Sequence, residues 1–145
     1  MKILTTEEVP LLLPAAHAFY EEAKLPGSVV DDVFVASWVN LIKSGSGVAF
    51  AELLDGKVIG TLGVIVYNDL CDGARVAVEA FWYVMPGNRG MIGSALYGEF
   101  ELWARTNAVK RMAMIRLEGL NDRAMHEFYV KKGYRILETM YVKEL

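Results

Sequence analysis

The stretch that decides the fold is "VAVEAFWYVMPGNRGMIGSAL", residues 76–96, in which a strand pattern gives way to a helix pattern. Pro86 ends the strand, and apolar residues three or four positions apart begin after Gly90. A parallel crossover places such a helix start beside the carboxyl end of its strand, where free N–H groups and the helix dipole attract anions. Gly90 and Gly93 would admit a phosphate to the backbone, and Arg89 adds a positive charge suited to a pyrophosphate. An ordinary strand-to-helix connection would look the same, so both interpretations stay open on this stretch alone.

The composition is that of a globular protein, and we expect one domain over residues 1–145. Hydrophobic residues make up 54% and charged residues 23%, and no run of 18 uncharged apolar residues is present. The first residues lack the apolar length of a secretory signal, so we expect a cytoplasmic protein without a membrane segment. One cysteine and two histidines offer no disulfide or metal pattern. The net charge of −3 argues against a nucleic-acid partner and suits a cationic one.

Hydrophobic spacing predicts helices before and after a strand-rich centre. A first helix over 7–23 has Thr6 as its N-cap, and a second begins at Asp31 or Asp32. Asp55-Gly56 between two β-rich runs predicts a tight hairpin. The predicted strands are 48–54, 57–67, 74–85 and 109–117, the later helices are 92–107 and one from Asn121, and one or two closing strands fall in 134–145.

Two motifs carry a family resemblance. "WYVMP" at 82–86 is followed by "NRGMIG" at 88–93, and "NDRAMHEFYVKKGY" occupies 121–134. With the order of elements, they resemble the GNAT superfamily of acyl-CoA-dependent N-acyltransferases over most of the chain, and faintly its bacteriophage-carried members. The resemblance implies an α+β, three-layer fold. Its sheet is mixed, mostly antiparallel and twisted, with a central parallel strand pair splayed for coenzyme A and about four flanking helices.

The phosphate loop departs from the family pattern at two positions. Asn88 stands where glutamine or arginine is usual, and Met91 stands where the middle glycine is usual. Shifting the frame by one residue makes Arg89 the basic residue but leaves the glycine spacing out of step. If Met91 supplies only its backbone N–H and turns its side chain to solvent, binding is preserved. If its amide needs a glycine conformation, affinity falls.

The resemblance implies transfer of an acetyl group from acetyl-CoA to an amine in a ternary complex, without a metal or an acyl-enzyme. The coenzyme would pair with the strand over 75–85, and an amide near Val84 would hold the developing oxyanion. The implied acid is Tyr129, although its local pattern also fits a core residue. Asn121 would bind the coenzyme while capping its helix. The implied coenzyme contacts are Trp82, Tyr83, Val84, Arg89, Gly90, Met91, Ile92, Gly93, Ser94 and Asn121.

A general base is suggested by the residues themselves. Glu79 interrupts the apolar run "VAVEAFWYV", where an ionised carboxylate is costly to bury without a partner or a wet cleft. A solvated edge or a structural hydrogen bond to a neighbouring strand explains Glu79 equally well. Glu52, Asp69 and Asp72 are weaker candidates.

The acceptor and the partners are the least defined part of the sequence. By resemblance, 20–40, 67–74 and 136–145 would form the acceptor site for an amine of a small molecule or a protein. A non-catalytic coenzyme A-binding or protein-interaction module is the alternative function. The closing "ETMYVKEL", residues 138–145, is a mixed-polarity strand at a probable sheet edge, and it predicts a homodimer.

Overall fold

Five strands form one sheet in the computed structural model, which describes residues 1–145. The strands are β1 (Lys2–Ile3), β2 (Gly47–Leu54), β3 (Lys57–Asn68), β4 (Arg75–Val84) and β5 (Arg111–Ala113). They lie side by side in chain order, with antiparallel pairing from β1 to β4 and parallel pairing between β4 and β5. This is the mixed, mostly antiparallel sheet of the expected α+β fold, and the parallel pair occupies one edge of it.

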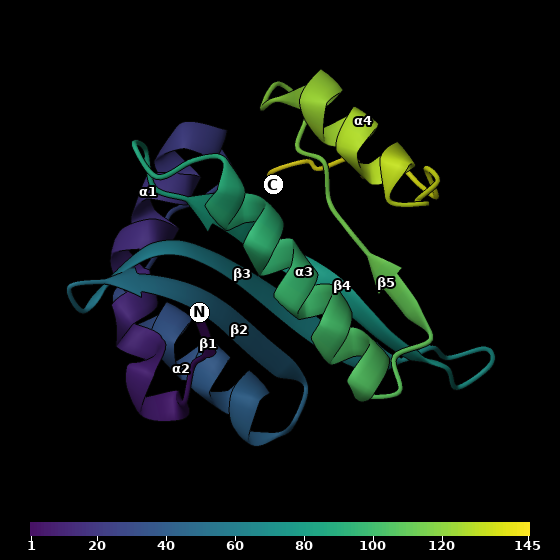
Figure 1. Cartoon of the computed structure of the whole chain (residues 1–145), viewed down its shortest axis with the longest axis horizontal. Coiled ribbons are helices and arrows are strands. Elements are labelled where there is room, and N and C mark those ends of the chain that lie inside the picture. Colours follow the sequence, from purple (N-terminus) through teal and green to yellow (C-terminus); the bar gives the residue numbers. More distant parts are fainter.

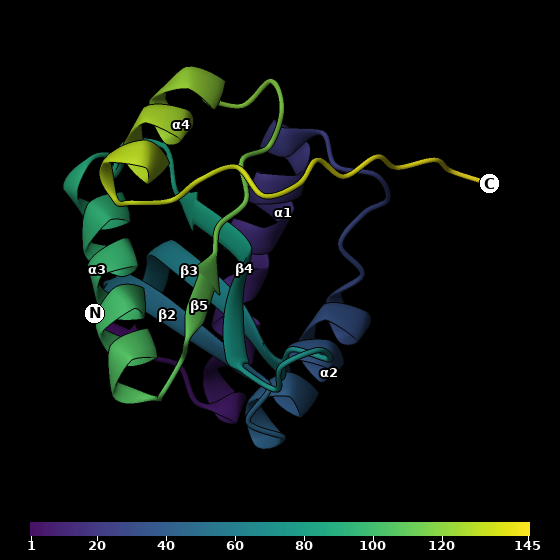
Figure 2. The same ribbon diagram turned by 90° about the vertical axis from the view of Figure 1, so that its right-hand side faces the viewer.

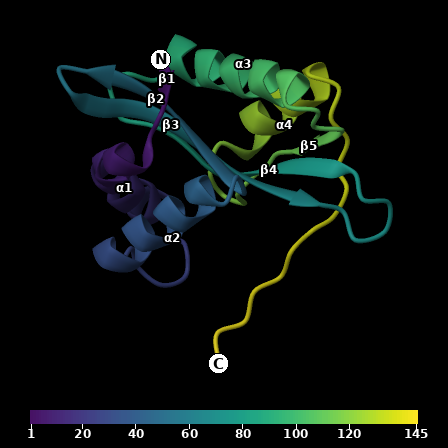
Figure 3. The same cartoon turned by 90° about the horizontal axis from the view of Figure 1, so that it is seen from below.

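Helices cover both faces of the sheet, which gives the three expected layers (Figure 3). They are η1 (Thr6–Leu12), α1 (Leu13–Ala23), α2 (Asp31–Lys43), α3 (Met91–Thr106) and α4 (Asp122–Lys131). The pair α1 and α2 lies on one face, and α3 runs across the other with α4 beyond it (Figures 1 and 3). None of these helices has the length and apolarity needed to cross a membrane.

The core is divided by the alternation of side chains along the strands. Val48 and Phe50 of β2 pack toward α3, where the rings of Phe50 and Phe100 are 6.1 Å apart. Ala49 and Ala51 face the opposite way, toward η1 and α1. Successive strand residues point to opposite faces, so one run of apolar residues supplies both halves of the core.

The hairpin and the main crossover match the expectations. Asp55 and Gly56 have φ values of 51° and 74°, as a two-residue type I′ turn requires. The predicted strand at 74–85 is β4, and the predicted helix at 92–107 is α3, each within one residue of its expected ends. Local turn chemistry and periodicity therefore determine this part of the fold.

The first predicted helix is wrong in its opening turns. Residues Thr6–Leu12 form the 3₁₀ helix η1, which contains Pro10, and α1 starts beside Pro14. Proline lacks the N–H that an α-helix interior requires, so the regular helix begins late. The N-cap is Thr5, in a capping box with Glu8, and not Thr6. Val30 holds the N-cap position of α2, so Asp31 and Asp32 lie in its first turn.

The predicted closing strands are also wrong. Residues 135–145 form no strand, and β5 is three residues long where 109–117 was expected. The segment leaves α4 and runs away from the body of the molecule (Figure 2). A strand exists only where a neighbour pairs with its backbone, and no neighbour lies along this path. Its exposed apolar side chains are Ile136, Leu137, Met140, Tyr141, Val142 and Leu145.

Gly63→Ala should destabilise the fold, because a Cβ at this position would lie 2.5 Å from the Phe81 ring and 2.8 Å from the Trp38 ring. Overpacking of this kind costs about 1–3 kcal/mol. The matched control is Gly98→Ala on the exposed face of α3, where nothing lies within 4 Å and helix propensity should stabilise by about 1 kcal/mol. Urea unfolding of both variants checks the opposite signs, and equal effects would contradict the close contact.

Candidate active site

The site lies where β4 and β5 separate. The two strands pair only from Val76 to Val78 on β4. Beyond that point β4 carries a bulge, because Glu79 and Phe81 have partners on β3 and Ala80 between them has none. A bulge bends its strand, and the free side of β4 after Val78 has no strand beside it. An edge of this kind can pair with an added extended chain.

Glu79 occupies the space between the separating strands. Its carboxylate accepts the Ile115 N–H at 3.0 Å and lies 3.4 Å from the Tyr129 hydroxyl. The residue is only 7% exposed. Burial raises the pKa of Glu79 to about 7, although the hydrogen bonds from Ile115 and Tyr129 act in the opposite direction. The carboxylate therefore changes its protonation near neutral pH and joins β4 to the chain after β5 and to α4.

Tyr129 reaches the same point from α4. Its hydroxyl donates to the Ile115 carbonyl at 2.8 Å. A hydroxyl has one hydrogen, so the Tyr129 oxygen remains able to accept from Glu79 when that group is protonated. Burial and then the nearby Glu79 charge raise the pKa of Tyr129 far above its ordinary value, which keeps the phenol protonated at neutral pH.

The start of α3 offers unpaired backbone donors. Gly90 caps the helix with φ 117° and ψ −113°, a conformation that favours glycine. The N–H groups of Met91, Ile92 and Gly93 have no backbone or side-chain acceptor, and the first turn, which includes Ser94, contains no acidic residue. The positive end of the helix dipole is therefore not neutralised, and an anion would bind there favourably.

Met91 resolves one of the two departures in the loop. Its side chain is 88% exposed, and its backbone has no positive φ. It stands at the first position of an ordinary helix, so glycine is not required there. Of the two outcomes considered for Met91, the structure has the one in which the side chain points to solvent.

Consecutive β4 residues serve opposite layers. Trp82 packs toward α3 and α4, with its ring 6.3 Å from Tyr97 and 5.7 Å from Phe128. A Cβ added to Gly93 would meet the Trp82 ring at 3.6 Å, an ordinary contact. Tyr83 points the other way and donates to Glu22 of α1 at 2.8 Å, whereas Val84 belongs to the core under α3.

Arg89 does not extend from the loop as a free charge. Its Nε donates to the Val84 carbonyl at 3.1 Å, and its guanidinium pairs with Glu22 and lies 5.5 Å from the centre of the Tyr83 ring. The hydrogen bond from Arg89 lowers the pKa of Glu22, with Tyr83 contributing further. The sequence did not reveal Glu22 as a partner, because no local pattern connects residues 67 positions apart.

Asn121 is confirmed as the N-cap residue of α4. It adopts the left-handed conformation, with φ 51°, and its side chain makes no capping hydrogen bond. The residue is exposed. Its amide is therefore available to a ligand, as the resemblance implied.

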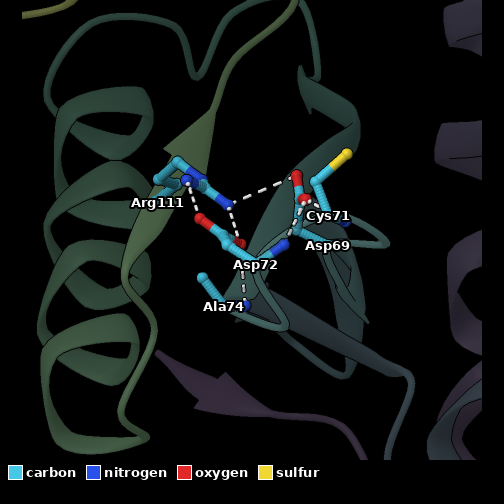
Figure 4. Close-up of polar contacts among 5 residues, drawn as sticks. All are labelled: Asp69, Cys71, Asp72, Ala74 and Arg111. Carbon is cyan, nitrogen blue, oxygen red and sulfur yellow. Dashed lines mark hydrogen bonds and ion pairs between the residues drawn. The ribbon is translucent and has the colours of Figure 1, made fainter.

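The other carboxylates considered as bases are committed elsewhere. Arg111 of β5 binds Asp72 through two hydrogen bonds of 2.8 and 2.9 Å and lies 3.3 Å from Asp69 (Figure 4). The Arg111 hydrogen bond is the main reason that the pKa of Asp72 falls to about 2. Glu52 pairs with the N-terminal amine of Met1 at 2.9 Å. Glu79 is thus the one carboxylate of the four that lies where β4 and β5 separate.

Glu79→Gln should remove a pH dependence of stability. The folded state holds the Glu79 proton more tightly than the unfolded chain, so wild-type stability falls as pH rises from the ordinary value near 4.5 to about 7. Relative to the glutamine variant, the wild type should lose about 1 kcal/mol per pH unit across this window. Urea unfolding of both proteins between these limits tests it. A constant difference would mean that the carboxylate is solvated.

Comparison with known proteins gives the same architecture throughout the chain. An acetyltransferase of Clostridium acetobutylicum solved with acetyl-CoA superimposes with a TM-score of 0.80 at 12% identity, covering 99% of this chain and 94% of the other. A ribosomal-protein-alanine N-acetyltransferase from Brucella melitensis biovar Abortus 2308 gives 0.72 at 19% identity, with 99% and 98% covered. An aminoglycoside acetyltransferase from an uncultured soil metagenomic sample, in complex with sisomicin, gives 0.79 at 15% identity, with 99% and 94% covered.

At these identities the superpositions establish the fold. No curated protein matches the sequence. A family model described as "Acetyltransferase (GNAT) family" matches residues 12–134, which include β4, α3, Glu79 and Tyr129. The chain therefore belongs to the GNAT family of acetyltransferases.

Proposed function

We propose that the protein transfers an acetyl group from acetyl-CoA to the primary amine of a small molecule or a protein, as one cytoplasmic acetyltransferase domain over residues 1–145. One observation carries this proposal: Glu79 and Tyr129 meet in a buried contact where β4 and β5 separate. A carboxylate that titrates near pH 7 beside a protonated phenol supplies both a base and an acid.

The chain has suitable groups to hold the coenzyme. The free N–H groups of Met91, Ile92 and Gly93 suit its pyrophosphate, and the unpaired edge of β4 over Trp82, Tyr83 and Val84 suits its pantetheine amides. The free Asn121 side chain lies at the start of α4 and offers a further donor and acceptor. When bound, acetyl-CoA supplies the activated acyl group, and no metal is needed for the transfer.

The two side chains divide the proton transfers between them. Glu79 takes a proton from the attacking amine as the new C–N bond forms and the C–S bond breaks. Tyr129 gives its hydroxyl proton to the departing sulfur. The contact of 3.4 Å between Glu79 Oε2 and the Tyr129 oxygen lets the proton taken from the amine replace the proton lost from the phenol. The products are an amide and a thiol, and the protein returns to its starting state.

A module that binds coenzyme A without turnover is the second candidate. The observation in its favour is Arg89, whose charge is paired with Glu22 and not directed to the phosphate loop. Thiol release from acetyl-CoA with a panel of primary amines distinguishes the two. Release that depends on an amine supports the enzyme, whereas tight binding without release with any amine supports the module.

Gly93→Glu should abolish coenzyme binding and leave the fold intact. The new side chain brings a negative charge to the end of α3 that is proposed to hold the phosphates. Calorimetric titration with acetyl-CoA and a melting curve provide the measurements. Met91→Gly is the matched control at the same helix end and should bind equally well or more tightly, because the Met91 side chain faces solvent. Unchanged affinity in Gly93→Glu would exclude this loop from the site.

Tyr129→Phe should lower kcat about 10²-fold to 10⁴-fold, with little change in acetyl-CoA affinity. The ring packing is retained, so the lost hydrogen bond to Ile115 should cost only about 1 kcal/mol of stability. Steady-state rates with one accepted amine at saturating acetyl-CoA give the comparison. Turnover within about threefold of wild type would assign Tyr129 a structural role, since a lost general acid has a much larger effect.

We also propose a homodimer in which residues 135–145 of one copy add to the free edge of β5 in a second copy. β5 ends the sheet, and an unpaired edge offers a row of backbone donors and acceptors. The closing segment exposes Met140, Tyr141 and Val142, which are residue types that pack well in strands. Pairing across two copies would cover these side chains and satisfy both backbones.

Removing residues 135–145 should give a monomer with little change in the melting temperature of the isolated chain, because this segment makes no contacts with the body that a strand would make. Light scattering at micromolar concentration measures the mass. Met140→Pro in the full chain should have the same effect, since proline cannot donate to a ladder. A monomeric wild type, or a truncated chain that is still dimeric, would refute the proposed contact.

A further inference from the structure

We infer that the acceptor is a primary amine with an apolar body, an alkyl or arylalkyl amine, which binds in an apolar cavity between α1, α2 and the sheet. This inference rests on the proposed function and names its acceptor class. The cavity has a volume of about 230 Å³, and all ten residues that line it are hydrophobic. Its aromatic walls are Phe19 and Tyr20 of α1, Phe34 and Trp38 of α2, and Phe81 of β4.

The cavity lies directly behind the proposed site of transfer. Ala80 and Phe81 line it, and these are the bulge residues that follow Glu79 in β4. The Glu79 carboxylate points to the opposite face of the sheet, toward Tyr129 on α4. Consecutive Cα atoms are only about 3.8 Å apart. An amine whose body fills the cavity would therefore have its nitrogen close to where β4 and β5 separate.

The walls of the cavity are fixed by their own packing. The rings of Trp38 and Phe81 meet edge to face at 5.1 Å, and Phe34 lies 6.4 Å from Phe81. Gly63 of β3 makes room for this arrangement, because a side chain there would collide with Trp38 and Phe81. A cavity that is already formed loses little conformational entropy when a ligand binds.

The lining excludes highly polar acceptors. No charged side chain lines the cavity, and the nearby His17 and Asp31 are paired with each other at 2.6 Å across α1 and α2. A polyhydroxylated polycation such as sisomicin would lose its hydration there without gaining partners. An apolar body instead gains the hydrophobic effect of every methylene that it buries. The acceptor class thus differs from that of the aminoglycoside enzyme that shares the fold.

The test is a series of unbranched primary alkylamines, with 2-phenylethylamine, ethanolamine and sisomicin as comparisons. Because each buried methylene contributes about 0.8 kcal/mol, kcat/KM should rise about fourfold per added methylene until the cavity is full. 2-Phenylethylamine should exceed ethanolamine, which has the same reactive group without the apolar body. Equal rates along the series, or a preference for sisomicin or ethanolamine, would overturn the inference.

Two variants tie the preference to the cavity. Ala16→Phe fills it from α1, and Ala36→Phe on the exposed face of α2 is the matched control. Calorimetric titration of 2-phenylethylamine should show at least tenfold weaker binding for the first variant and wild-type binding for the second. Ile65→Glu places a carboxylate at the half-open wall on β3 and should also weaken binding, even if Ala16→Phe fails to fold. Wild-type affinity in Ile65→Glu or in a folded Ala16→Phe refutes the site.

Failure of this inference is distinguishable from failure of the proposed function. Binding of acetyl-CoA and acetylation of polar amines, with no preference for apolar ones, would retain the enzyme and reject the cavity as its acceptor site. Tight 2-phenylethylamine binding with no acetyl-CoA binding would retain the cavity as an amine site and reject the acetyltransferase.

Discussion

One carboxylate stands where the ladder between β4 and β5 would otherwise continue. The strands pair as far as Val78, and the next bond across the gap runs from the Ile115 N–H to the side chain of Glu79. A side chain is longer than a backbone carbonyl, so this bond allows the strands to diverge and still satisfies a buried donor. The raised pKa of Glu79 reflects the cost of placing that charge away from water. Without the carboxylate, the Ile115 N–H would lack its acceptor and Tyr129 a neighbour.

The helix that faces the gap depends on a second constraint, the absence of a side chain at Gly60. A Cβ there would lie 2.7 Å from Ile92 and 3.2 Å from Leu96, so only glycine lets α3 pack this closely against β3. Close packing at its first turn directs the start of α3 toward β4. The free N–H groups of Met91 and Gly93 then point beyond the sheet and not into another element. Two local features, a bulge and a glycine, thus create the opening and position its donors.

The sequence predicted the parts of this site that depend on local chemistry. Asp55-Gly56 can form few other turns, and Glu79 attracted attention because a carboxylate in an apolar strand needs a reason. The ion pair of Arg89 with Glu22 was unpredictable, since it depends on how α1 packs against β4. The closing segment failed for a related reason. Its residues favour a strand, but pairing requires a partner that composition cannot specify.

The bulge also explains how one strand can serve two ligands. In a regular strand, side chains alternate between the faces, and each face receives every second residue. At the bulge, Ala80 and Phe81 both point toward α1 and α2, while Glu79 before them and Trp82 after them face α4. The proposed acceptor cavity therefore gains two adjacent wall residues without displacing the proposed catalytic and coenzyme-binding groups. An acetyl group moving between the ligands would need to cross only the thickness of β4, at the point where the strand has no partner on its free side.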